Sequence, residues 1–166
     1  LKQYDHILSD DPLYGPWAKE FVAKLKDISE FLADHLHHPP SGQVDLRVTY
    51  VDSCHLRHGQ KITRQPRQLL QAIPGVQLTE MARNRRDAYC CGAGGMIGYD
   101  FSDMANLAGA DRIAEAEATG AEILVSACPA CVMQLQQSRQ KTRSKIKVMD
   151  LTELVASQMR PLRTID

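Results

Sequence analysis

The spacing of the cysteines is the feature that most constrains this chain. All five lie within one stretch, as Cys54, the adjacent pair Cys90-Cys91, and the pair in Cys128-Pro129-Ala130-Cys131. The pattern reads C-x35-C-C-x36-C-x2-C, so two nearly equal intervals each end in a compact cysteine group. Thiolate sulfur is a soft ligand, and five thiols brought together favour a thiophilic metal centre. We therefore predict that all five cysteines are metal ligands.

The adjacent cysteines and the glycines after them indicate the kind of centre. In an extended segment Cys90 and Cys91 point to opposite faces, so both can serve one centre only if the chain kinks or the centre is large. Gly92, Gly94 and Gly95 permit a kink and let backbone N–H groups approach an anionic inorganic core. A multi-iron cluster fits five thiolates better than one zinc ion, which four ligands satisfy.

The composition excludes several classes of protein. The chain has 166 residues, which fits one domain of ordinary size, and 43% of them are hydrophobic. The 20 basic and 20 acidic residues cancel, so nucleic acid is not an expected partner. No apolar run approaches the ~18 residues of a transmembrane helix, and no signal peptide is visible. An odd number of cysteines argues against a secreted disulfide scaffold and favours a reducing cytoplasm.

Residues 1–42 are predicted to form a lead-in segment and an amphipathic helix. Residues 1–13 are polar without clear periodicity and are expected to dock on something else. From Pro16 onward, apolar residues at three- and four-residue steps predict one helix of about five turns. These residues are Trp17, Phe21, Leu25, Ile28, Leu32 and Leu36. The stripe packs on the chain's own domain in the simpler interpretation, or against another domain or a partner in the alternative. His35, His37 and His38 are interpreted as solvated rather than metal-binding.

Strand and helix patterns alternate over residues 43–166. Alternating or continuous apolar residues predict strands at 44–50, 76–78, 123–125 and 146–149. Helices are predicted at 64–73, at 103–119, from Cys128 onward and after Asp150. Such alternation favours an α/β fold with a largely parallel sheet and flanking helices, preceded by the amphipathic helix. Because ligands bind at the carboxyl ends of such strands, Cys54 and Cys128 are expected to meet there.

Three stretches of the chain resemble a known family. They are Asp52-Ser53-Cys54-His55-Leu56, Tyr89-Cys90-Cys91-Gly92-Ala93-Gly94-Gly95 and Ser126-Ala127-Cys128-Pro129-Ala130-Cys131. Together they resemble the cysteine-rich CCG domain, which is found in heterodisulfide reductase and in the iron–sulfur subunit of glycolate oxidase. Residues 2–12 and the run His58-Gly59-Gln60-Lys61 are similar to the glycolate oxidase subunit in particular. The resemblance implies a Rossmann-like CCG domain over residues 43–166.

The resemblance also implies an iron–sulfur electron-transfer module rather than a complete enzyme. The cluster would be of the 4Fe–4S type, and a non-cubane form would give Cys90 or Cys91 a bridging role. Zinc could substitute in the same thiolate set. The implied complex has a flavoprotein subunit that oxidises a 2-hydroxy acid such as glycolate or lactate. The full-length subunit would carry an upstream ferredoxin-like domain, of which this chain, beginning at Leu1, would be the carboxy-terminal continuation. Its expected location is the cytoplasm, or the inner face of the membrane through its partners.

Residues beside the cysteines have expected roles as well. Four of them are expected to bind the cofactor, namely His55, Gly92, Gly94 and Gly95. His55 or His58 would donate a hydrogen bond to a cluster sulfur, although an ordinary loop histidine is the alternative for each. The basic stretch at 83–86 is interpreted as a solvated loop, with a docking patch for an acidic partner as the alternative.

Three other functions are open at this point. A structural zinc site using four of the five cysteines would make the chain a passive interaction module. A thiol–disulfide enzyme built on Cys128 and Cys131 would resemble thioredoxin, but it leaves Cys54, Cys90 and Cys91 without a role. A cluster like that of heterodisulfide reductase would act on a disulfide substrate through an open face.

Overall fold

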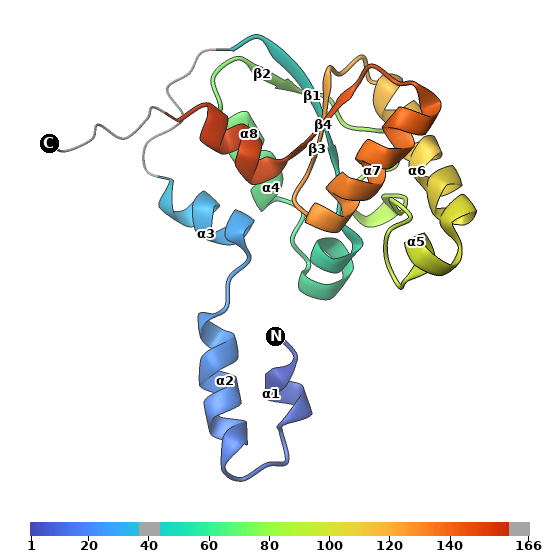
Figure 1. The fold of residues 1–166 in the computed structure, drawn as a ribbon. Helices are drawn as coiled ribbons and strands as arrows, with labels where there is room; N and C mark the ends of the chain where they lie inside the picture. The colour runs from blue at the N-terminus through green and yellow to red at the C-terminus, as the bar shows by residue number, and fades with distance from the viewer. Residues whose placement is uncertain (37–43, 160–166) are drawn as a thin grey trace, which may run out of the picture.

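A parallel sheet lies at the centre of the computed structural model, which describes residues 1–36 and 44–159 (Figure 1). The sheet has four strands in the order β2-β1-β3-β4. They are β1 (Leu46–Val51), β2 (Val76–Leu78), β3 (Ile123–Ser126) and β4 (Lys147–Asp150). Every neighbouring pair is parallel, which confirms the predicted fold class. β3 is buried along its whole length, as a strand covered on both faces must be.

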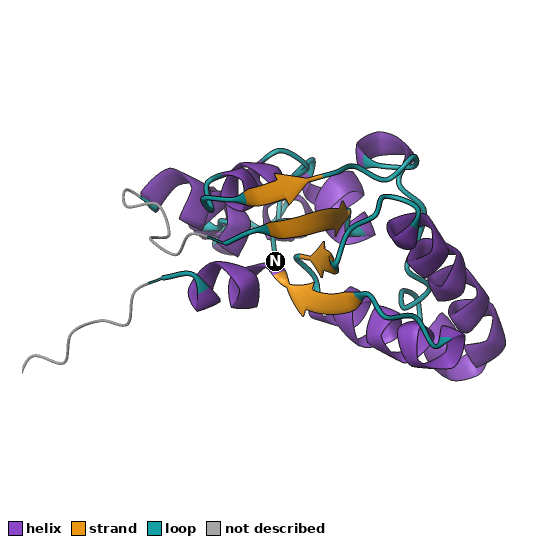
Figure 2. Cartoon of the chain, turned by 90° about the horizontal axis from the view of Figure 1, so that it is seen from above, coloured by secondary structure: helices purple, strands orange, loops and turns teal. Residues whose placement is uncertain are grey.

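Helices cover both faces of the sheet (Figure 2). One face carries α3 (Ile28–His35), α4 (Gln65–Gln71) and α8 (Leu151–Ser157), and the other carries α6 (Ser102–Glu117) and α7 (Pro129–Thr142). On the first face the buried cluster joins Leu70 and Leu154 to Val125 of β3. On the second, Ile113 and Leu135 pack with Leu124 of the same strand. The strand side chains alternate between these two cores because successive residues of a strand point to opposite faces.

The path of the chain diverges between β1 and β3. From β1 it passes through α4 on one face to β2, whereas from β3 it passes through α7 on the other face to β4. In open α/β sheets, ligands bind at such a switch point, beyond the carboxyl ends of the two strands. Cys54 follows β1 and Cys128 follows β3, and the pairing of Val51 with Ser126 sets these strand ends side by side.

The single helix predicted between Pro16 and Leu36 is wrong. The structure has two helices, α2 (Tyr14–Lys24) and α3, because Asp27 starts a new one. The Asp27 carboxylate accepts a hydrogen bond from the Ser29 N–H at 2.9 Å, and Glu30 accepts one from the Asp27 N–H at 3.0 Å. This reciprocal capping box satisfies N–H groups that a helix start leaves free, so the helix begins there.

The two halves of the predicted apolar stripe have different surroundings. Leu32 and Leu36 pack on the core of the first face, as the simpler interpretation expected. Trp17 and Phe21 of α2 remain 66% and 45% exposed. Phe21 stacks on Tyr4 of the short helix α1 (Tyr4–Ile7), and α1 and α2 form a hairpin that stands away from the sheet (Figure 1). His37 and His38 lie outside the described residues.

Several short elements have no counterpart among the predicted ones. The π-helix η1 (His55–Gln60) follows Cys54, the 3-10 turn η2 (Arg85–Asp87) precedes the cysteine pair, and α5 (Ile97–Asp100) follows it. The helix α1 within the predicted lead-in was not predicted either. From β1 onward, the remaining helices and strands fall close to their predicted positions. Within the ranges that the structure describes, no helix has the length and apolar character needed to cross a membrane.

Candidate metal centre

The cysteines come together at the carboxyl edge of the sheet. The sulfur atoms of Cys91 and Cys131 are 2.9 Å apart. Cys131 also forms a hydrogen bond with Cys128. The Cys54 thiol lies close enough to Cys90, Cys91 and Cys128 for their charges to raise its pKa. The fold therefore brings all five sulfurs from three distant segments into one region, although their role as ligands stays a prediction.

The sulfurs do not form a compact cage for one ion. Across residues 1–36 and 44–159, no group of three or more His, Cys, Asp or Glu side chains has an arrangement that could hold a single metal ion. Cys91 and Cys131 are buried, Cys54 and Cys128 are half-buried, and Cys90 is exposed. The adjacent Cys90 and Cys91 thus differ in burial, in keeping with side chains that point to opposite sides of an extended segment.

Backbone N–H groups surround the sulfurs. The Gly92 N–H donates a hydrogen bond to Cys90 Sγ at 3.4 Å, and the Ala93 N–H donates one to Cys91 Sγ. The Cys128 sulfur accepts hydrogen bonds from the N–H groups of Ala130 and its neighbour Cys131 in the first turn of α7, and Cys54 accepts one from the N–H of the residue that follows it. Such N–H groups, together with the positive end of the helix dipole, stabilise negative charge on sulfur.

The thiol pKa values follow from these contacts. Hydrogen bonds to Cys128 and Cys91, with burial, raise the pKa of Cys131, so Cys131 holds its proton. The hydrogen bond from Cys131 lowers the pKa of Cys128 to about 5, in spite of burial. The same partner lowers the pKa of Cys91 to about 7. Burial, reinforced by the charge of Cys90, raises the pKa of Cys54. Cys128, which also accepts backbone N–H bonds, is therefore readily ionised near neutral pH, and the thiolate is the form that binds metal.

The glycines after the cysteine pair have different surroundings. Gly92 has φ +92°, and a Cβ atom built on it would lie 2.4 Å from the Ala105 carbonyl oxygen of α6. This position therefore needs glycine for packing. Gly94 and Gly95 face open space, and Gly95 has φ +64°. The space beside Gly94 and Gly95 can therefore accommodate a bound group, whereas α6 fills the space beside Gly92.

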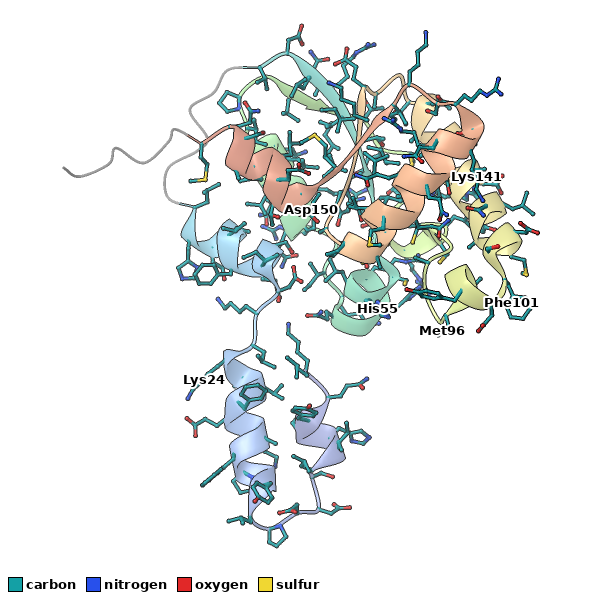
Figure 3. All side chains as sticks on the ribbon, in the orientation of Figure 1. Lys24, His55, Met96, Phe101, Lys141 and Asp150 are labelled. Atoms are coloured by element: carbon teal, nitrogen blue, oxygen red, sulfur yellow. The ribbon has the colours of Figure 1, made fainter. Side chains whose placement is uncertain are left out.

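The structure places the two candidate histidines at the surface. His55 and His58 are exposed and belong to η1. Figure 3 labels His55. The His55 side chain lines a cavity of about 450 Å³ with Leu1, Lys2 and Gly59, among other residues of the lead-in and η1, and no cysteine lines that cavity. His55 approaches the site through its backbone N–H, and its predicted imidazole contact with a cluster stays a prediction.

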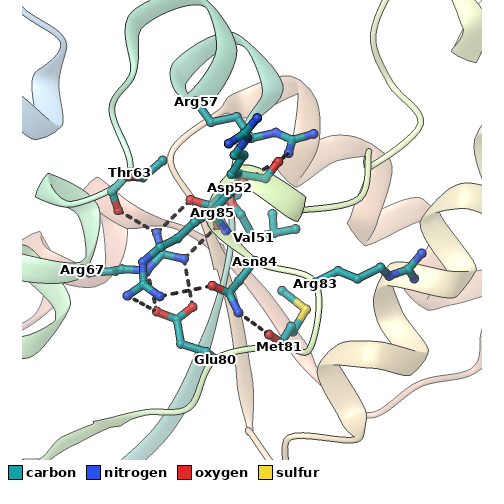
Figure 4. A network of polar contacts seen from close by, with 12 residues as sticks. Val51, Asp52, Arg57, Thr63, Arg67, Glu80, Met81, Arg83, Asn84 and Arg85 are labelled. Atoms are coloured by element: carbon teal, nitrogen blue, oxygen red, sulfur yellow. Dashed lines mark hydrogen bonds and ion pairs between the residues drawn. The ribbon is translucent and has the colours of Figure 1, made fainter.

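A buried ion network beside the site was missed from the sequence (Figure 4). The Arg67 guanidinium of α4 donates two hydrogen bonds of 2.8 Å to the Asp52 carboxylate and two more to Glu80. Arg67 and Asp52 are 4% and 5% exposed. Arg67 also lies over the Tyr50 ring, 5.0 Å from its centroid. The only indication of this network in the sequence was Asp52, an acidic residue two positions before Cys54. No local sequence pattern identifies Arg67 as its partner.

This network joins the segment of Cys54 to the segment that leads to the cysteine pair. Asp52 accepts a hydrogen bond of 2.7 Å from the Arg85 N–H. Arg57 of η1 donates hydrogen bonds to the carbonyl oxygens of Arg85 and Arg86 at 3.2 and 2.7 Å. Cys54 thus lies between two residues, Asp52 and Arg57, that are both hydrogen-bonded to the segment leading to Cys90.

The basic stretch at 83–86 is more tied to the fold than a solvated loop would be. Arg83 pairs with Glu115 of α6 and lies 4.3 Å from the centroid of the Tyr89 ring. Arg85 pairs with Glu80. The fully buried Arg112 donates to the Arg83 carbonyl oxygen at 3.2 Å and pairs with Glu115. These arginines therefore hold the approach to Cys90 in place, and a docking role for the stretch stays a prediction.

A parallel α/β sheet that gathers cysteines from three segments at its switch point defines a class of cysteine-rich domain. Residues 48–136 match the family described as the CCG cysteine-rich domain. The chain belongs to this family, which confirms the resemblance drawn from its motifs.

Three relatives illustrate the range of the family. The chain is 36% identical over 163 residues to the probable glycolate oxidase iron-sulfur subunit of Bacillus subtilis (strain 168), covering 93% of this chain and 35% of the relative. It is 37% identical over 144 residues to one subunit of the dihydromethanophenazine:CoB--CoM heterodisulfide reductase of Methanosarcina barkeri, covering 85% and 35%. It is 31% identical over 159 residues to lactate utilization protein A of Halalkalibacterium halodurans, covering 95% and 64%. The chain spans about a third of the length of the first two relatives.

Proposed function

We propose that this chain is the iron–sulfur electron-transfer module of an oxidoreductase complex. The gathering of five cysteine sulfurs at one edge of the sheet is the observation that carries the proposal. The similarity to a glycolate oxidase iron-sulfur subunit and to a heterodisulfide reductase subunit supports it. A bound iron–sulfur cluster would supply reversible one-electron chemistry, which none of the protein's own side chains offers at ordinary potentials.

The donor set fits a cluster of the 4Fe–4S type better than one zinc ion. Cys54, Cys91, Cys128 and Cys131 would hold it from three sides, and the exposed Cys90 would complete or bridge a non-cubane form. The N–H groups at four of these sulfurs offset the negative charge of iron, sulfide and thiolate. Because the cysteines do not form a single-ion cage, zinc would need them to rearrange. Gly94 and Gly95 leave open space beside the pair, in which a cluster could lie.

The proposed complex oxidises a 2-hydroxy acid of the glycolate or lactate kind. Its flavoprotein subunit would remove the electrons, and this module would carry them onward from an upstream ferredoxin-like domain of the same full-length subunit. The names of the glycolate oxidase and lactate utilization relatives support this assignment, and the chain covers only 35% of the glycolate oxidase subunit. The proposed location is the cytoplasm, at the inner face of the membrane through partners.

Anaerobic reconstitution with iron and sulfide tests the proposal. The protein is expected to turn brown and to hold iron and acid-labile sulfide in comparable amounts. Cys91→Ser, which removes a buried sulfur 2.9 Å from Cys131, is expected to lose most of the cluster. A variant with all five cysteines replaced by serine controls for iron bound elsewhere. Full reconstitution of every single serine variant would contradict the ligand assignment, and stoichiometric zinc without iron after anaerobic purification would favour the structural zinc site.

A second candidate function is reduction of a disulfide substrate at the cluster. A cavity of about 480 Å³ beside the cysteine loops favours it, lined by Ala93 and Ala130 near the sulfurs and by Tyr99, Met133 and Gln137 farther out. The similarity to a heterodisulfide reductase subunit supports it too. When a disulfide and an excess of a one-electron reductant are added to the reconstituted protein, each disulfide would take up two electrons and two protons and be released as two thiols. An electron carrier alone would stay reduced in the presence of the disulfide.

A further inference from the structure

A second cavity, of about 480 Å³, lies beside the start of α4 and next to the buried ion network. Among the described residues, its lining contains three arginines and neither a carboxylate nor a cysteine. Its volume is in the range of small-molecule sites, which is about 300–1,000 Å³. The lining residues are Thr63, Arg64, Arg67, Gln68, Gln71 and Arg85.

The arginines of this cavity outnumber the carboxylates that neutralise them. Asp52 and Glu80 both pair with Arg67 (Figure 4). Glu80 also pairs with Arg85 at 3.1 Å. Within residues 1–36 and 44–159, no carboxylate lies at ion-pair distance from Arg64, which is exposed. Three arginines and two carboxylates thus leave one positive charge uncompensated at the cavity.

The same arginines are held in place without a ligand. Arg67 is fixed by its two hydrogen bonds to Asp52, and the Arg85 N–H donates to the same carboxylate at 2.7 Å. The Gln68 amide, turned with its oxygen toward Arg64, accepts hydrogen bonds from the Nε and Nη2 atoms at 3.1 Å. Because an amide is neutral, this contact orients the Arg64 guanidinium without cancelling its charge. A ligand would therefore have little side-chain ordering to supply when it binds.

The excess charge and the donors at the cavity favour a carboxylate. A carboxylate carries one negative charge, which balances the excess, and its two oxygens match the fork of a guanidinium. A phosphate monoester carries about −1.5 to −2 at pH 7 and would exceed the balance. The surrounding segment is basic as well, since residues 55–87 contain seven Lys and Arg against two Asp and Glu. Such a local excess of positive charge attracts anions.

We propose that this cavity binds a small monocarboxylic acid through the guanidinium groups of Arg64 and Arg85. The inference goes beyond the proposed function, because the site needs no cluster and contains no metal ligand. Arg64 caps the start of α4, and Arg85 belongs to the segment that precedes Cys90. The bound acid would therefore add a link between these two segments. Lactate is the first probe, since the proposed complex oxidises acids of this kind.

Titration of the purified chain with sodium lactate, followed by amide NMR at constant ionic strength, tests the inference. Saturable shifts are expected at residues 63–71 and around Arg85, and neutral lactamide is expected to cause none. Arg64→Gln removes the uncompensated charge from an exposed side chain and is expected to weaken lactate binding about tenfold or more. Arg143→Gln is the matched control, because Arg143 is an exposed arginine that follows α7 on the opposite face of the sheet. This variant is expected to bind lactate as the parent does.

The possible outcomes separate this inference from the proposed function. No saturable response to lactate, an equal response to lactamide, or equal weakening in Arg64→Gln and Arg143→Gln would overturn the inference while the proposed function stands. Tighter binding of inorganic phosphate or of a blocked glutamate would overturn it too, because the cavity would then serve a phosphate group or the side chain of a partner. A protein that binds lactate but takes up no cluster would contradict the proposed function alone.

Discussion

Asp52 is a buried acidic residue two positions before Cys54, and its hydrogen bonds explain how the fold tolerates a buried carboxylate. Its carboxylate accepts two hydrogen bonds from Arg67 and one from the Arg85 N–H. The network with Asp52 and Glu80 raises the pKa of Arg67 against the effect of burial, so Arg67 stays charged. A buried ion pair adds little stability over apolar packing, but loss of one partner leaves an uncompensated charge. The stability of this corner thus depends on Arg67.

Arg67→Met tests this dependence. The substitution keeps a long side chain but leaves Asp52 buried without its main partner, and we expect the free energy of unfolding to fall by about 3–5 kcal/mol. Arg47→Met is the control, because Arg47 forms an exposed pair with Glu122 at 3.1 Å and such pairs contribute less than about 1 kcal/mol. Urea unfolding followed by circular dichroism measures both. Similar losses in the two variants would show that the network does not anchor this corner.

At the scale of elements, the loop of the cysteine pair depends on its contact with α6. Gly92 approaches the Ala105 carbonyl so closely that no side chain fits, and the buried Gly109 one turn farther along α6 has the Ser138 hydroxyl of α7 beside it. Small residues thus let the loop, α6 and α7 pack tightly. The position of Cys91 is set by this packing as much as by its own chain neighbours.

Gly92→Ala is expected to be destabilising, with Gly94→Ala as its matched control. An alanine at Gly92 has an unfavourable positive φ, which costs about 1–3 kcal/mol, and its Cβ would meet the Ala105 oxygen. The loop must shift, so we expect both the unfolding free energy and the cluster content after reconstitution to fall. Gly94 faces open space, and its alanine variant is expected to match the parent in both. Equal cluster content in Gly92→Ala would contradict this view of the loop.

Local patterns in the sequence predicted most of the elements but not the contacts between them. Parallel strands were predictable because their buried side chains form apolar runs, and convergence of Cys54 and Cys128 followed from the rule for strand ends. The break before α3 was missed because the apolar period continues across Asp27, although Asp27 and Glu30 have capping-box spacing. The ion pair between Arg67 and Asp52 could not be predicted, because it joins residues of different elements and no periodicity in the sequence indicates it.

At the scale of the whole molecule, the α1–α2 hairpin and the sheet domain are unequal parts. Within α2 only Gly15 and Ala18 are buried, whereas the sheet domain has a core on each face. The pair of Lys2 with Glu30 at 2.9 Å links the hairpin to α3. Few buried apolar contacts mean low local stability, so the hairpin is expected to open separately from the rest.

Trp17 provides a direct measurement of this difference. It is the only tryptophan of the chain and is 66% exposed on α2. We expect a solvent-like emission maximum in the native protein and almost no change in emission across the urea transition that circular dichroism detects. Tyr50→Trp in a Trp17→Phe background places the probe in the core and is the control that should follow the main transition. A large cooperative shift of Trp17 emission at that transition would contradict the prediction.

The direct pairing of β1 with β3 has a consequence for the order of events during synthesis. Val51 and Ser126 are neighbours across the sheet yet 75 positions apart along the chain, and contacts of such separation form late in folding. A slip of these strands by two residues would carry Cys54 about 7 Å away from Cys128. Binding of a cluster would therefore stabilise only the sheet in which β1 and β3 pair in the native register. Its binding free energy would favour the native register over a shifted one.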